Sequence, residues 1–247
     1  GPSFLEHIAA FVLMGVIPFQ SLMRGQIFEV EEPLTTQEKF SIYKANSFSQ
    51  WFISAILVGI WFLSGKNFYD LGFRWPQVED PMAVWLLSGT FLMAYLFDAW
   101  WQLRNKAARI KQVKEWSKYT PFLPTTGKQM AGFLMVVITA AICEEILFRG
   151  FLIHYLFQLL DHSLTSTFIA VLLPSIIFAS SHMYQGWQAV AKIAILATVF
   201  STLLILTGSL IIPIILHFLV NLFSGLLGVF FWEKAMKEST GMQDFPQ

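Results

Sequence analysis

The 247-residue chain has little charge and almost no cysteine. Only 13% of its residues are charged, about half the share found in soluble domains, whereas 55% are hydrophobic and the mean hydropathy is +0.59. Basic and acidic residues balance at 16 each, so there is no excess of positive charge to indicate nucleic-acid binding. The single cysteine, Cys143, excludes an internal disulfide and a cysteine-based zinc site. The low share of charged residues and the high mean hydropathy indicate a multi-pass membrane protein.

Apolar runs long enough to cross a bilayer, at about 20 residues each, recur along the whole chain. They predict an all-α bundle of about seven transmembrane helices, and six to eight are allowed because the first run is short and contains Pro18. The expected spans cover residues 8–23, 48–64, 82–101, 130–160, 164–182, 189–206 and 210–232.

Four parts of the chain are expected from this pattern. Residues 1–3 look like a tag scar left by a protease and are set aside. Residues 4–122 hold the amino-terminal transmembrane helices and a basic cytoplasmic segment, 123–233 a helical core, and 234–247 a cytoplasmic tail.

Basic residues are distributed unevenly between the two ends of the spans. If the loop 104–128 is cytoplasmic, alternation places the polar segment 24–46 and the tail on the same side. All 16 basic residues except Lys66, Arg74 and Arg149 then lie there. Cytoplasmic loops are enriched in Lys and Arg, so we predict that the amino end is outside and the carboxyl end cytoplasmic. The basic stretch itself is expected to lie at the headgroups and bind anionic lipid generically.

The run from Glu144 to Gly150 places two carboxylates and one guanidinium inside an apolar span. A charge at the bilayer centre costs roughly 2.5–3.5 kcal/mol and therefore marks a candidate site. Glu145 and Arg149 are four residues apart on one helical face and can neutralise each other. Glu144 lies about 100° around the helix and needs donors from other helices. It suits a general base; the competing interpretation is a protonated Glu144 that only packs.

Two later spans carry further polar side chains. Phe178 and His182 are four residues apart, so the ring can brace the imidazole. His217 and Asn221 have the same spacing and offer two donors to an oxyanion. Each pair alone could be interfacial or interhelical packing. With Glu144, however, they form a sufficient set for hydrolysis of a carbonyl compound by an activated water.

Zinc-dependent chemistry is the second interpretation of the same residues. The His-Glu-x-x-His pattern of zincins is absent, but His182, His217 and Glu144 are an allowed zinc ligand set. We rank zinc second because no local pair of ligands pre-forms such a site, so the first expectation is that no cofactor is needed. Cys143 has no histidine close in sequence to activate it, and we interpret it as a small residue that fills space in its helix.

In these motifs the chain resembles the CPBP family (CAAX protease and bacteriocin-processing, or Abi) of intramembrane proteases, which is related to the type II CAAX prenyl endopeptidases. The family pattern is Glu-Glu-x-x-x-Arg, then Phe-x-x-x-His, then His-x-x-x-Asn, and the chain matches all three in order within residues 123–223. Three short segments also look like family flanks: Phe148-Arg149-Gly150, Thr207-Gly208-Ser209-Leu210 and Leu71-Gly72-Phe73-Arg74.

The resemblance implies a catalytic helical core over 123–233 with a cavity open to the cytosol. Glu144 and His182 would activate water, without metal. His217 and Asn221 would stabilise the tetrahedral oxyanion. The residues that would support the site are Glu145, Arg149 and Phe178. The implied partners are the lipid bilayer and a membrane-associated peptide or lipidated protein, such as a prenylated CAAX-type substrate, and not nucleic acid.

A different class of function remains open at this point. The same polar cluster would serve packing or ligand binding in a non-catalytic membrane scaffold or a bacteriocin-immunity protein. Glu144→Gln separates the two classes because it keeps the shape of the side chain and removes the base. A proton-coupled transporter is the third possibility and the weakest, since the sequence shows no repeated half with interrupted helices.

Overall fold

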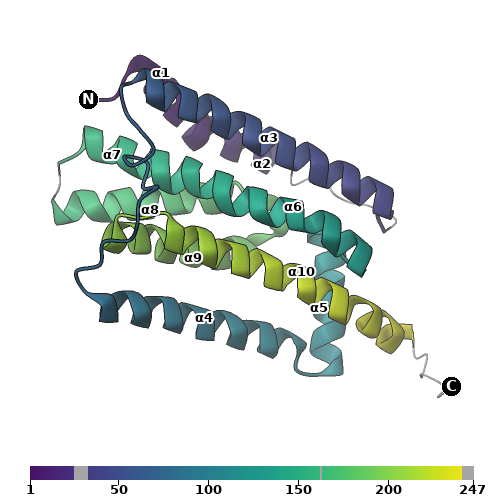
Figure 1. Ribbon diagram of the computed structural model, residues 1–247. Coiled ribbons are helices and arrows are strands. Elements are labelled where there is room, and N and C mark those ends of the chain that lie inside the picture. Colours follow the sequence, from purple (N-terminus) through teal and green to yellow (C-terminus); the bar gives the residue numbers. More distant parts are fainter. Residues whose placement is uncertain (25–32, 162, 241–247) are drawn as a thin grey trace.

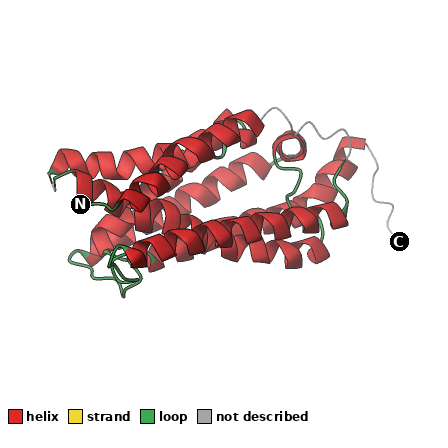
Figure 2. Ribbon diagram, turned by 90° about the horizontal axis from the view of Figure 1, so that it is seen from above, coloured by secondary structure: helices red, strands yellow, loops and turns green. Residues whose placement is uncertain are grey.

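The computed structural model describes residues 1–24, 33–161 and 163–240, and this part of the chain is helical without strands. Six helices are long and apolar enough to cross a membrane, and the shorter apolar helix α8 (Leu164–Ser180) adds a seventh. The predicted all-α bundle of about seven spans is therefore confirmed. Figures 1 and 2 show the long helices packed side by side. Part of the predicted polar segment, His162 and the end of the predicted tail lie outside the described residues.

The first span is one continuous helix in three parts: α1 (Phe4–Phe11), the π-helix η1 (Val12–Val16) and α2 (Ile17–Arg24). Pro18 has no N–H and crowds the turn before it, and η1 lies directly before that proline. The wider π turn is a common way for a helix to absorb such a disruption. Ser3, which the sequence analysis set aside, accepts a hydrogen bond from the Glu6 backbone N–H and caps α1.

The second span, α3 (Thr36–Leu63), begins well before the predicted start at residue 48. Thr35 and Glu38 form a capping box at its amino end, and such a box supplies partners to helix N–H groups that otherwise have none. Lys39 lies in the predicted polar segment 24–46, but its side chain is buried. Its Nζ donates to the Leu123 carbonyl at 2.7 Å and to Gln129 Oε1 at 3.3 Å. The polar residues here therefore belong to a packed helix.

The third span and the basic stretch form two separate helices, α4 (Pro81–Leu103) and α5 (Lys106–Tyr119). Little of α4 is buried, so most of its apolar surface is left for lipid. In Figure 1, α5 turns away from the direction of the spans, at the end where α3 and α6 begin. A basic helix crossing one end of the bundle is consistent with the predicted position at the headgroups.

The fourth span is one long helix made of α6 (Gly127–Glu144), the π-helix η2 (Glu145–Ile153) and α7 (His154–Leu159). It is followed by α8, which Ser163 caps, the short 3₁₀ turn η3 (Met183–Gln185), α9 (Trp187–Thr207) and α10 (Ile211–Thr240). The largest buried apolar cluster surrounds η2, so the π-helical segment lies in the centre of the bundle.

The three family-like flanks meet at one end of the bundle. Leu210 donates its backbone N–H to the Gly72 carbonyl at 2.9 Å. Arg74 donates Nε to the Gly208 carbonyl at 2.5 Å. A Cβ on Gly150 would lie only 3.0 Å from the Leu71 carbonyl oxygen. The loop from Leu71 to Arg74 is thus seated against η2 on one side and the α9–α10 turn on the other, and it holds η2 in place.

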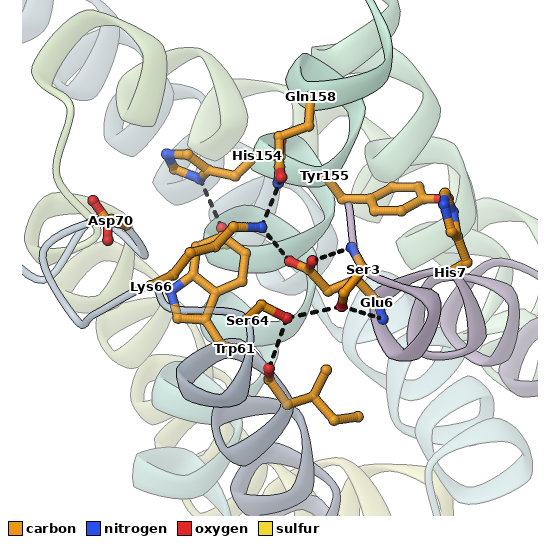
Figure 3. Close-up of polar contacts among 12 residues, drawn as sticks. Ser3, Glu6, His7, Trp61, Ser64, Lys66, Asp70, His154, Tyr155 and Gln158 are labelled. Atoms are coloured by element: carbon orange, nitrogen blue, oxygen red, sulfur yellow. Dashed lines mark hydrogen bonds and ion pairs between the residues drawn. The ribbon is translucent and has the colours of Figure 1, made fainter. Parts of the chain in front are cut away.

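A polar cluster ties α1 to the end of α3 and to α7 (Figure 3). Glu6 is fully buried and forms an ion pair with Lys66. The Lys66 ammonium also donates to Gln158 Oε1 at 2.7 Å and lies 4.4 Å from the centre of the Trp61 ring. Buried charges are tolerated when they are paired and hydrogen-bonded in this way. The cluster therefore fastens the first helix to the helix that carries η2.

Candidate active site

The Glu145–Arg149 pair lies in η2 with both side chains at 0% exposure. Arg149 Nη1 donates to Glu145 Oε1 at 3.0 Å, which is the pairing that the spacing predicted. The guanidinium carbon also lies 4.5 Å from the centre of the Phe178 ring and 5.7 Å from that of Phe200. An aromatic face attracts a cation that has lost its water. The pair is therefore an internal, charge-balanced support.

His217, from α10, lies between the two glutamates. Its Nδ1 is 2.7 Å from Glu145 Oε1, and its Nε2 is 3.7 Å from Glu144 Oε2. Because Arg149 stabilises Glu145 as a carboxylate, Glu145 can only accept, and His217 Nδ1 must carry the proton. The second ring nitrogen is then directed at Glu144, in the way that a carboxylate orients a catalytic imidazole.

Glu144 finds its donors on other helices, as expected for a carboxylate without a partner on its own helix. Gln50 of α3 donates Nε2 to Glu144 Oε1 at 2.9 Å. The Glu144 side chain remains 12% exposed, whereas that of Glu145 is completely buried. Gln50 lies outside the three motifs and was therefore not among the predicted site residues. The only sequence feature that could have indicated it is that Gln50 is a carboxamide within the apolar run 48–64.

Glu144 and His217 face each other across a short gap. Their nearest atoms, Glu144 Oε2 and His217 Nε2, are 3.7 Å apart, slightly beyond hydrogen-bond distance. Arg149 is paired with Glu145, so His217 is the nearest basic side chain that ion-pair distances give to Glu144 within the described residues. The two groups are thus placed as an acid–base pair that a small movement or one water can connect.

Phe178 connects His182 to this group. Its ring centre lies 4.7 Å from that of His182 and 6.2 Å from that of His217, so the predicted bracing of His182 is present. His182 Nδ1 donates to the Phe178 carbonyl at 2.9 Å, which leaves Nε2 available. Within the described chain, no hydrogen bond or ion pair joins His182 to Glu144. His182 and His217 thus both lie against the Phe178 ring.

Tyr184, in η3, is a second residue that the sequence analysis did not single out. Its ring stacks on that of His182, with the centres 6.0 Å apart. Burial raises the pKa of Tyr184 to about 12, and the nearby Glu144 carboxylate adds to this effect. The phenol therefore stays protonated at neutral pH and is a donor close to Glu144. An aromatic residue in a short turn carries no sequence signal for such a role.

Asn221 and Cys143 complete the predicted set. Asn221 follows His217 by one turn of α10 and is half-buried, and no hydrogen bond of its side chain is found in the described part of the chain. The structure thus brings Glu144 and His217 together, whereas the Asn221 side chain is not hydrogen-bonded to either of them. Cys143 is fully buried beside Glu144, which fits the interpretation of a small filling residue.

The predicted zinc ligands do not form a metal-binding arrangement. Among residues 1–24, 33–161 and 163–240, no group of three or more His, Cys, Asp or Glu side chains is placed to hold a metal ion. We therefore derive no step through a metal.

Comparison with known proteins bears on the same helices. Residues 126–223 match the model of the family described as type II CAAX prenyl endopeptidase Rce1-like. No curated protein and no solved structure matches the chain. The matched segment contains all three motifs and the helices from α6 to the middle of α10.

Proposed function

We propose that the chain is a CAAX-type intramembrane protease with a specific mechanism, because residues 126–223 match the model of the Rce1-like family of type II CAAX prenyl endopeptidases. Water activated at Glu144 hydrolyses a peptide bond in a prenylated or otherwise membrane-associated peptide. The catalytic core is the part we assign to 123–233. By the distribution of basic residues, the site opens to the cytoplasmic side, with the amino end of the chain outside.

The observation that carries the proposal is the placement of His217 between Glu145 and Glu144, at 2.7 Å and 3.7 Å. In the proposed reaction, Glu144 takes one proton from water as the oxygen adds to the scissile carbonyl carbon. The proton passes between Glu144 and His217 and then to the departing amide nitrogen when the C–N bond breaks. Atoms and charges balance with one water consumed and no cofactor.

The remaining residues are assigned roles by their position around this pair. His182 assists Glu144 in orienting the water, with its free Nε2 as the acceptor. Asn221 and the imidazolium form of His217 donate to the oxyanion of the tetrahedral intermediate. Phe178, Glu145 and Arg149 hold these groups in place. Only donors that meet charge as it develops in the transition state accelerate the reaction.

The test uses the purified full-length protein in liposomes with a farnesylated peptide ending in a CAAX sequence, followed by mass spectrometry of the products. Wild type should release the terminal tripeptide, and Glu144→Gln should not, although it folds. A chelator should leave the rate unchanged, and loss of activity that zinc restores would contradict the metal-free mechanism. Failure of wild type to cleave any such peptide would favour a scaffold or immunity protein.

A further inference from the structure

The buried face of α3 is polar in one half and apolar in the other. Its buried positions, together with the half-buried Gln50, recur every three to four residues, which is the spacing of one helical face packed against a neighbour. From the amino end, they are Lys39, Tyr43, Ser47, Gln50, Ser54, Leu57 and Trp61. The polar half begins at the proposed cytoplasmic end and passes Glu144, which Gln50 contacts. Its partner is α6, with which α3 makes its most extensive contact.

Two polar atoms on this face, Ser47 Oγ and Gln50 Oε1, are buried without a hydrogen-bond partner, whereas Ser54 Oγ lies against the Cys143 thiol. Ser47 and Ser54 are 4% and 2% exposed. The orientation of Gln50 follows from chemistry, because the Glu144 carboxylate accepts from the amide nitrogen and leaves the amide oxygen without a donor. Each unpaired buried polar atom is costly, and bound water is the usual way in which such atoms are satisfied.

We propose that Gln50 Oε1 and Ser47 Oγ hold a water molecule beside Glu144, and that this site supplies the water consumed in hydrolysis. Ser47 precedes Gln50 by three residues, so both side chains project from one face of α3. The inference rests on the proposed function, and it assigns the amino-terminal half of the chain a part in the reaction. Gln50 then acts as a positioning residue: Nε2 orients Glu144, and Oε1 accepts one O–H of the stored water, which exchanges this bond for the one to His182 Nε2 when it moves to the scissile carbonyl.

The position along α3 explains why such a site is needed. Gln50 lies fourteen residues after Thr36, which places it about 21 Å into the span at the rise of an α-helix. A hydrolase needs one water for each bond it breaks, and about four helical turns separate Gln50 from the start of α3. Beyond Ser54 the same face continues with Leu57 and Trp61, which are buried and apolar there; the Trp61 ring packs on Phe151 of η2, and its N–H is already used on the Asn67 carbonyl. Water is therefore confined to the half of α3 that leads to Glu144.

A labelling experiment tests the water site without relying on activity. Ser47→Cys is made in a Cys143→Ala background, so that it carries the only thiol, and is exposed to silver ions, which are close to water in size and react with thiols only where water reaches. Leu57→Cys is the dry control and Lys44→Cys the exposed one. Ser47→Cys should react at least about tenfold faster than Leu57→Cys, as expected for a hydrated buried position. Equal, slow reaction at the two positions overturns the proposal.

A kinetic experiment tests the role in catalysis. Ser47→Val fills the space and removes the hydroxyl, and it should lower kcat about tenfold with little change in KM, because only the reacting water is lost. Ser88→Val is the matched control: Ser88 Oγ is also buried and unpartnered, but it lies on α4. An unchanged kcat in Ser47→Val overturns the role in catalysis. If wild type cleaves peptides but Ser47→Cys is not labelled, only the water site fails and the protease stands.

Discussion

His217 Nδ1 and Arg149 Nη1 both contact the same oxygen of Glu145, at 2.7 Å and 3.0 Å. Glu145 is therefore more than the counter-ion that its spacing to Arg149 predicts. It links the buried ion pair to the imidazole that faces Glu144, so the stability of the helix and the orientation of the site depend on one carboxylate. Changes at Glu145 and at Glu144 should consequently have different effects, although the two residues are adjacent.

Glu145→Ala should impair folding, so that activity is lost because little folded protein remains. It leaves Arg149 buried without a counter-ion, and breaking a buried pair by removing one partner costs about 3–5 kcal/mol. We expect little protein in the membrane fraction and a strongly lowered unfolding temperature in detergent. The double variant Glu145→Leu/Arg149→Met removes both charges and should regain much of the stability but not the activity. A stable single variant would contradict the proposed support.

Glu144→Gln should lose activity and keep its fold. The carboxamide has the shape of the carboxylate and can still accept a hydrogen bond from Gln50, so the unfolding temperature should stay near that of wild type. Loss of a general base typically lowers the rate about 10²–10⁴-fold, and mass spectrometry of a farnesylated peptide measures this. Cleavage at the wild-type rate would show that Glu144 only packs.

Gly150→Ala should destabilise the protein through a steric clash. The added methyl group would lie 3.0 Å from the Leu71 carbonyl oxygen and 3.2 Å from Leu210 Cδ1, and backbone cannot move aside as a flexible side chain can. Overpacking of this kind costs about 1–3 kcal/mol, and activity should also fall because η2 carries Glu145. Thermal unfolding in detergent gives the measurement. Gly59→Ala, where the methyl group meets nothing within 4 Å, is the control and should be neutral or slightly stabilising.

The spans and the charged pair could be predicted from the sequence because both are local. Hydropathy over about 20 residues finds a membrane helix, and a spacing of four residues brings Glu145 to Arg149. The predicted start of α3 was too late because the residues before 48 are largely polar. One of them, Lys39, is nevertheless buried, because it donates to Leu123 and Gln129, which are distant in sequence. The hydropathy of a segment gives no information about such a contact between distant residues.

The partners of the site were harder to predict for the same reason. Gln50 reaches Glu144 from a helix outside the motifs, and the position of His217 between two glutamates depends on how α10 packs against η2. The three family-like flanks were noticed as patterns, but nothing local indicates that Gly150 and Gly72 pack at the same loop and turn. Pairwise packing between distant segments is the part of the fold that a single sequence leaves undetermined.

The Glu6–Lys66 pair of Figure 3 should contribute far more to stability than an ion pair at the surface. Lys66→Met removes the cation and leaves the Glu6 carboxylate fully buried, which should cost about 3–5 kcal/mol. Lys111→Met is the matched control, because Lys111 and Glu115 are 4.0 Å apart and well exposed. A pair of that kind contributes about 0–1 kcal/mol. Thermal unfolding of both variants in the same detergent measures the difference. Equal unfolding temperatures would mean that the Glu6 carboxylate finds other partners, and that the first helix does not depend on Lys66 to stay attached to α7.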